Sequence, residues 1–183
     1  MKKLMLLVLP LFLSACGYNT IQTMDETAAA ARQQIEVQLQ RRADLVPNLV
    51  STVKGYAAQE EAIFTEVANA RARLAGSLSG GNMGEMAEAN QAMTGALGRL
   101  LVITENYPQL KSDQNFLRLQ DELTGTENRI AVSRTDYNNS VRDYNAYIRK
   151  FPAVLTAKVT GAKSREYFEV SNAENREAPK VQF

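Results

Sequence analysis

The chain has 183 residues, with 21 basic and 20 acidic side chains, and its formal net charge of +1 gives no electrostatic footprint for nucleic acid. It contains no histidine and one cysteine, so the usual ligands of zinc, copper and haem sites are missing and no intramolecular disulfide can form. These counts argue against the common metalloenzyme classes and predict a fold that packing alone stabilises.

Residues 1–15 have the pattern of a secretory signal peptide. Lys2 and Lys3 follow the initial methionine, residues 4–13 are almost wholly apolar, and small residues precede Cys16. About ten apolar residues are too few for a transmembrane helix, which needs about 20 to cross the hydrocarbon core. We therefore predict that residues 1–15 are removed and that the mature chain begins at Cys16.

Cys16 is predicted to carry a lipid that anchors the chain to a membrane. Leu13-Ser14-Ala15-Cys16 matches the lipobox of bacterial lipoproteins, in which the cysteine sulfur receives a diacylglycerol. The alternative is an ordinary small core residue, but a lone cysteine in an exported protein calls for an explanation, and lipidation gives one. Two or three acyl chains make such attachment effectively permanent. Because Gly17 and not aspartate follows the cysteine, we expect the periplasmic side of the outer membrane, rather than the inner membrane, in a Gram-negative host.

The first helical pattern runs from Ile35 to Leu74. If Arg42 and Glu60 are allowed as interruptions, its apolar positions alternate in steps of four and three residues, which is the spacing of a coiled-coil seam. Pro47 lies inside this pattern, and a proline there removes a backbone hydrogen-bond donor. The unbroken spacing favours one long first helix kinked near Pro47, whereas Asp44 as an N-cap would favour a fresh start. We expect a kink or tight break that leaves both halves on the same face.

A glycine-rich segment, residues 76–84, separates the first pattern from the second. It is predicted to be a loop, and a phosphate cradle is disfavoured because no strand precedes it and no Lys-Ser/Thr pair follows. An apolar seam from Met86 to Ile103 then predicts a helix that ends near Pro108.

A third long pattern, capped by Ser112, carries its seam from Phe116 to Phe151. Pro152 closes or kinks it, and a short helical piece to about Val159 is possible. No segment shows sustained alternation at the period of two that is typical of strands. The fold class is therefore all-α, an antiparallel up-down bundle of three to four long helices.

The predicted organisation has four parts. Residues 1–15 are the signal peptide, and residues 16–34 form a lipid-anchored tether and the start of the first helix. Residues 35–160 form the helical bundle, and residues 161–183 form an irregular tail. Phe168, Val170 and residues 181–183 suggest that this tail docks at least partly.

Three blocks of sequence, in this order, resemble the LemA family. They are Gln38–Val50 continuing to Ala57, Glu105–Pro108 followed by Asn115–Leu117 and Glu122–Ile130, and Asp136–Asn145 ending at Arg149–Pro152. The resemblance covers roughly residues 19–183 and implies an antiparallel bundle of long helices attached to a membrane at its N-terminus. Family members usually carry an N-terminal transmembrane helix, so a lipobox in its place is a departure. The family is not known for an enzymatic reaction.

An enzymatic function is not expected from the remaining residues. Ser51-Thr52-Val53-Lys54 fits the Ser-x-x-Lys nucleophile motif, but that motif belongs to larger, sheet-based enzymes, and Ser51 and Lys54 are interpreted as a polar helix face. Adjacent carboxylates such as Glu60-Glu61 diverge around a helix, so no metal site and no cofactor are predicted.

A repeated Tyr-Asn pair is the most informative polar pattern. Tyr137-Asn138 and Tyr144-Asn145 are seven residues apart and therefore lie on nearly the same side of a helix. Amphipathic aromatic rings beside amides suit an interhelical polar layer or, alternatively, a surface that binds a partner.

Together these features predict a membrane-anchored, non-enzymatic helical lipoprotein that acts as a scaffold or adaptor in the bacterial cell envelope and binds a protein partner. The alternative is a protein that binds an envelope lipid or small molecule in the bundle interior near Met86 and Met93, since methionine adapts to varied apolar ligands.

Overall fold

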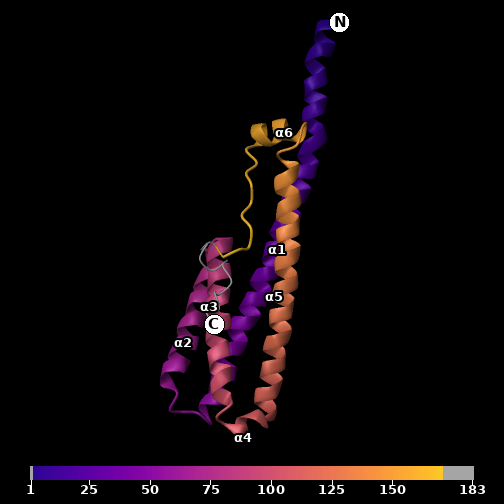
Figure 1. Cartoon of the computed structure of the whole chain (residues 1–183). Coiled ribbons are helices and arrows are strands. Elements are labelled where there is room, and N and C mark those ends of the chain that lie inside the picture. The colour runs from indigo at the N-terminus through magenta and orange to yellow at the C-terminus, as the bar shows by residue number, and fades with distance from the viewer. Residues whose placement is uncertain (1, 171–183) are drawn as a thin grey trace, which may run out of the picture. The chain divides into compact units, whose positions relative to one another are not determined.

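The computed structural model of the chain describes the backbone of residues 2–170 and the side chains of residues 17–170. Within this range it contains six helices and no strand, which confirms the all-α prediction (Figure 1). The chain forms two compact units. Unit 1 comprises residues 1–35 and 133–167, and unit 2 comprises residues 36–132 and 168–183. No helix in the described part combines the length and apolarity that a membrane-spanning segment requires.

The longest helix, α1 (Lys2–Lys54), is unbroken through Pro47, so the fresh start considered at Asp44 is wrong. The kink itself remains a prediction. Residues 17–34, expected to begin as a tether, are helical throughout, and both Ile21 and Ala28 are buried. Of the Ala-rich run in this segment, Ala28 packs within the chain, whereas Ala30 is exposed.

Pro47 removes the donor that would normally satisfy the carbonyl of Ala43, four residues earlier. That carbonyl accepts a hydrogen bond of 2.8 Å from Nε of Arg71, on the next helix of unit 2. A guanidinium thus replaces the missing amide donor, which explains how helical geometry persists across the proline.

The seam from Ile35 to Leu74 does not form one helix, contrary to expectation. α1 ends at Lys54 and α2 (Glu61–Leu78) begins after a six-residue turn. The amides of Gly55 and Ala57 close the end of α1 by bonding to the carbonyls of Ser51 and Val53. The prediction was wrong because the turn keeps the three-and-four spacing of the apolar residues, so the sequence pattern shows no break between the two helices.

The loop between α2 and α3 (Met83–Thr104) is shorter than the predicted residues 76–84. Asn82 caps α3 by accepting a bond from the Glu85 amide, and the Glu85 side chain accepts one from the Asn82 amide, a complete capping box. Gly81 is required in the preceding turn, because a Cβ there would lie 2.5 Å from the carbonyl oxygen of Ser77. Of the glycines in this segment, Gly81 is the one the turn requires, since a Cβ at Gly76 or Gly80 would meet nothing within 4 Å.

Two short helices flank the last long one. α4 (Pro108–Lys111) precedes α5 (Gln114–Tyr147), and α6 (Ala153–Thr160) follows it, ending at Gly161 with a φ of 72°. The side chain that caps α5 is Asp113, not Ser112 as predicted: Asp113 Oδ1 accepts a bond of 2.9 Å from the Phe116 amide. Ser112 instead ends α4.

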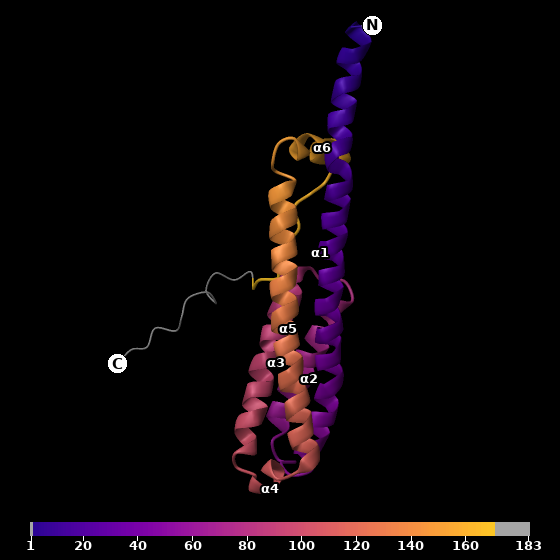
Figure 2. The ribbon, with the colours of Figure 1, turned by 90° about the vertical axis from the view of Figure 1, so that its right-hand side faces the viewer.

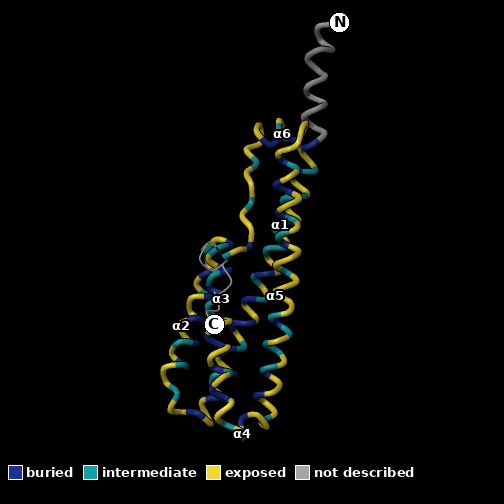
Figure 3. Tube along the Cα trace, in the orientation of Figure 1, coloured by how far each residue is buried: buried dark blue, intermediate teal, exposed yellow. Residues whose placement is uncertain are grey.

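In unit 2, the helices pack through the apolar seams that the sequence predicted. Buried positions recur along α3 and the first half of α5 (Figure 3). The fully or nearly fully buried seam residues include Leu39, Val46, Leu49, Val53, Val67, Leu74, Met86, Met93, Leu100 and Phe116. Ile63 departs from the prediction, since it is half-buried and its neighbour Phe64 is buried.

In unit 1, the first part of α1 and the last part of α5 run side by side, and α6 folds back across them (Figures 1 and 2). Their core contains Ile21, Tyr144, Ile148 and Ala157. Phe151, predicted as the last seam residue, is instead 80% exposed, because α5 has already ended at Tyr147. Residues 161–170 carry no helix, and Phe168 is buried. Residues 181–183, predicted to dock, lie outside the described residues.

Candidate functional site: a clamped strap and a buried arginine

The Tyr-Asn pattern lies in unit 1, on the last turns of α5. Tyr137, Tyr144 and Asn145 are buried, with exposed fractions of 1%, 3% and 6%, and Asn138 is half-buried. A partner surface built from these residues needs them to be accessible, and three of the four are in the interior. Their position is that of a polar layer inside the unit.

Asn145 holds a piece of irregular chain that follows α6. We call residues 161–167 the strap. The Asn145 side chain donates from Nδ2 to the carbonyl of Arg165 and accepts at Oδ1 from the Arg165 amide, both at 2.9 Å. The hydroxyl of Tyr137 donates to the next carbonyl, that of Glu166, at 2.7 Å. Side chains of α5 therefore satisfy backbone groups of the strap that no helix or strand supplies with partners.

The strap is also joined to α1 by an ion pair. Nε of Arg165 lies 2.7 Å from Oδ1 of Asp25, 140 positions away in sequence. The hydrogen bond from Arg165 lowers the pKa of the Asp25 carboxyl, and the same bond raises the pKa of the arginine. Burial raises the pKa of Tyr144, and the nearby Asp25 charge adds to this. The negative charge of Asp25 and the positive charge of Arg165 therefore compensate each other within the cluster.

Unit 2 has its own polar cluster, centred on Arg42 of α1. Arg42 is 4% exposed; its Nη1 donates to Oδ1 of Asn90 on α3 at 2.6 Å and lies 2.5 Å from Oε2 of Glu127 on α5. Burial lowers the pKa of Arg42, and the charge of Glu127 opposes this shift. Nε of Arg42 has no hydrogen-bond partner among the described residues, and neither has Oε1 of Gln38, one turn earlier. The seam had marked Arg42 only as an interruption.

A buried ion pair of this kind costs free energy through desolvation, and its best-attested role is to fix which helices pair and in which register. Arg42 contacts two other helices, α3 and α5, so it selects one arrangement of all three in unit 2.

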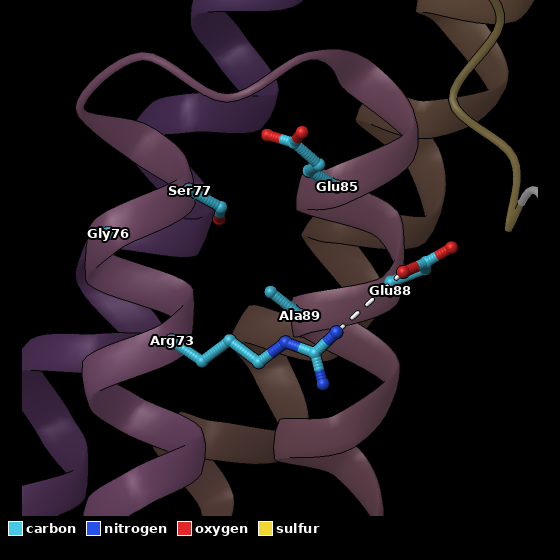
Figure 4. Close-up of a pocket in the computed structure, with 6 residues that line it drawn as sticks. All are labelled: Arg73, Gly76, Ser77, Glu85, Glu88 and Ala89. Atoms are coloured by element: carbon cyan, nitrogen blue, oxygen red, sulfur yellow. Dashed lines mark ion pairs between the residues drawn. The ribbon is translucent and has the colours of Figure 1, made fainter.

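A cavity of about 240 Å³ lies between α2 and α3 in unit 2 (Figure 4). It is lined by Arg73, Gly76, Ser77, Glu85, Glu88 and Ala89. The guanidinium of Arg73 reaches Glu88 across it at 3.7 Å, and Glu85 is already engaged in the capping box. Arg73, Glu85 and Glu88 therefore already pair with other groups of α2, α3 and the loop between them. The residues that line the cavity do not provide a set of free donors and acceptors that point toward one ligand.

The other residues considered from the sequence are not gathered into a reactive site. Ser51 and Lys54 are exposed at the end of α1. Among the described residues, no cluster of three or more His, Cys, Asp or Glu side chains could hold a metal ion. Met86 and Met93 are fully buried and line neither the cavity of Figure 4 nor a second one of about 420 Å³ near Phe116 and Lys111. The side chain of Cys16 lies outside the described ones.

Sequence reasoning found the Tyr-Asn positions but missed their partners. The ion pair of Asp25 with Arg165 leaves no local signal, because the strap has no periodicity. Arg42 could have been singled out, since a charged residue at a core position of a seam is expected to have a buried partner.

The chain is similar in sequence to known proteins. Magnetosome proteins MamQ 1 and MamQ 2 of Paramagnetospirillum magneticum are each 34% identical over 175 residues, which cover 83% of this chain. The magnetosome protein MamQ of Magnetospirillum gryphiswaldense is 34% identical over an alignment of 174 positions that covers 82% of the chain. The matched region spans 64% of the length of each of these relatives. The model of the LemA family matches residues 31–183, and the chain therefore belongs to the LemA family.

Proposed function

We propose that this protein is a membrane-tethered, non-enzymatic scaffold or adaptor of the bacterial cell envelope, attached through a lipid on Cys16. Its body is an up-down bundle of long helices that presents exposed surfaces to a protein partner. In a Gram-negative host, the lipid places it on the periplasmic side of the outer membrane. The lipobox carries the proposal, because it supplies an anchor at the end of the chain where family members usually have one.

The packing next to Cys16 supports attachment at this residue. Gly17 is buried, and a Cβ there would lie 3.6 Å from Cα of Ala153 in α6. Ile21, one turn further on, belongs to the core of unit 1. Packed structure therefore reaches the residue next to the proposed lipid.

The use of the charged side chains supports a non-enzymatic role. Two charged contacts with a buried or half-buried partner, Asp25 with Arg165 and Arg42 with Glu127, are ion pairs between segments of the same unit. The relatives are named as magnetosome proteins and not after a reaction. A structural role for the shared helical region accounts for both observations.

Metabolic labelling with palmitate tests the anchor. The wild-type chain should incorporate label and fractionate with membranes, and Cys16→Ala should lose the label. Label that persists in Cys16→Ala would remove the lipid from the proposal. Ser14→Ala is a matched control, because it keeps a small residue before the cysteine and should leave labelling intact.

Cross-linking in living cells tests the adaptor role. Photo-reactive residues belong at exposed apolar positions of unit 2, such as Val102 and Val132, which are 64% and 61% exposed. A stoichiometric protein cross-linked at these positions, and not at buried Met93, would identify the partner. Recovery of the protein alone, or with only a bound lipid, would favour the ligand-binding alternative.

A further inference from the structure

α6 and its approach expose large apolar side chains. Phe151, Leu155 and Val159 are 80%, 56% and 88% exposed. Leu155 and Val159 are four residues apart in α6 and so share one face of the helix, and Phe151 precedes Leu155 by another four. Phe151 lies outside the helix, in the turn before it, so the helical spacing applies to Leu155 and Val159 alone. Single exposed apolar residues are ordinary, but two on one face of a short helix, with a third just before it, call for an occupant.

The opposite side of α6 is fixed in unit 1. Ala153, Thr156 and Ala157 are buried, and Ala157 packs in the core cluster with Ile21 and Tyr144. Thr160 ends the helix and donates its hydroxyl to the Thr156 carbonyl at 2.9 Å. The outward apolar face therefore belongs to a docked helix.

The same segment is strongly basic. Residues 144–165 contain no aspartate or glutamate. They carry five basic side chains, of which Arg165 pairs with Asp25; the other four, Arg149, Lys150, Lys158 and Lys163, are exposed. Apolar residues surrounded by lysine and arginine are typical of a helix that lies in the interface of an anionic membrane, where each basic residue adds to the attraction.

The position of α6 matches such a surface. The nearest atoms to a Cβ at Gly17 are Cα of Ala153 and Oγ1 of Thr156, both at 3.6 Å. Gly17 directly follows the proposed lipid attachment site, so a lipid on Cys16 holds α6 close to the bilayer. This step rests on the proposed function.

We propose that the exposed face of α6, which carries Leu155 and Val159, is a second membrane contact that lies in the anionic headgroup region beside the lipid anchor. Phe151 in the preceding turn adds apolar surface, and the flanking basic residues Arg149, Lys150, Lys158 and Lys163 add charge. The lipid supplies attachment, and the α6 face orients the body of unit 1 on the membrane. The positive charge of this surface favours an anionic bilayer over a second copy of this chain, because two copies of the same basic surface repel each other.

The test uses the mature lipoprotein carrying Val159→Cys. The thioether at Cys16 blocks the only native thiol, so a fluorophore reports position 159 alone. The protein is reconstituted in vesicles of phosphatidylcholine with or without phosphatidylglycerol, and quenching by brominated lipid is measured. Position 159 should be quenched in the anionic vesicles and much less in neutral ones. The matched control is Val102→Cys, equally suited to labelling at 64% exposure, which should be quenched in neither.

Charge variants separate this surface from general adsorption. Lys158→Gln with Lys163→Gln should abolish the quenching at position 159 in anionic vesicles, whereas Lys54→Gln with Lys111→Gln in unit 2 should not. Equal exposure of positions 159 and 102 to an aqueous quencher in anionic vesicles would overturn the proposal. Protection of position 159 without bromolipid quenching, at a concentration-dependent level, would assign the face to a second copy instead.

The anchor is decided separately by the mass of the purified protein. A mass without acyl chains would remove the lipid on Cys16. The quenching measurement is then repeated in the Cys16→Ala background with vesicles added from outside, and quenching at position 159 still decides whether the α6 face binds an anionic bilayer.

Discussion

The side-chain amide of Asn145 makes the most direct contact that holds the strap in place. It pairs with both the amide and the carbonyl of Arg165, so Asn145→Ala leaves two backbone groups without partners. An unsatisfied buried polar group costs about 1–3 kcal/mol. We expect a Tm several degrees lower and faster hydrogen exchange of the Arg165 amide. Asn139→Ala, at an exposed position of the same helix, should change neither, and an unchanged exchange rate in Asn145→Ala would contradict the clamp.

The ion pair of the strap predicts a pH dependence of stability. The pKa of Asp25 is lower in the folded chain than its ordinary value, because Arg165 donates to the carboxylate. Such a pair stabilises the fold at pH values above the unfolded pKa of about 3.9, and this contribution is lost as the pH falls through the folded pKa.

Thermal melting of Asp25→Asn against wild type measures this contribution. The Tm difference should be constant near neutral pH and shrink below about pH 4. Because the Asp25 side chain is 40% exposed, the difference should be small and decrease with salt. Arg165→Gln should have the same effect, and the double variant should add nothing further. Additive effects of the two substitutions would show that the residues do not act as a pair.

For individual residues, the sequence predicts which face of a helix a polar side chain lies on, but not which group it contacts. The seven-residue spacing of Tyr137 and Tyr144 correctly placed both on one side of α5. The strap contributes backbone atoms to the cluster, and backbone atoms leave no residue-type signal. The partner of Asn145 could therefore be found only from the structure.

At the scale of helices, the continuity of α1 depends on a contact from α2. Arg71→Met should lower the free energy of unfolding by about 1.5–3 kcal/mol, the contribution of a hydrogen bond to a charged group, because it orphans the Ala43 carbonyl. In a Pro47→Ala background the restored amide can bond to Ala43, so the same substitution should cost much less.

Chemical denaturation of the four chains measures this coupling. Arg73→Met is the matched control. Arg73 lies on the same helix as Arg71, but its exposed side chain pairs with Glu88 of α3. Its substitution should therefore cost equally little with either residue at position 47. If Arg71→Met costs the same in both backgrounds, the arginine does not replace the donor that Pro47 lacks.

The helices themselves were largely predictable, and their boundaries were not. The seam from Met86 to Ile103 and the first part of that from Phe116 became α3 and α5 because each buries one apolar stripe. The break before α2 was missed because a turn can keep the phase of the pattern. Phe151 was misplaced for the opposite reason, since the spacing continues although the helix has stopped.

For the whole molecule, Gly17 is relevant to two properties: the packing of unit 1 and the predicted sorting of the protein to the outer membrane. In Gram-negative sorting, glycine after the lipidated cysteine favours the outer membrane, and aspartate retains a lipoprotein in the inner membrane. Gly17→Asp should therefore move the protein to the inner-membrane fraction of a density gradient. Gly17 is also buried beside Ala153, so a side chain there disturbs α6 as well.

Gly17→Asn separates the two effects, because asparagine has nearly the shape of aspartate without its charge. Both variants should lower the Tm, since a buried polar side chain beside α6 lacks its hydration. Only Gly17→Asp should change the membrane fraction. If both variants relocate, the packing of α6 against Gly17 governs sorting; if neither does, the residue after Cys16 carries no address, and the choice of membrane must be encoded elsewhere in the chain.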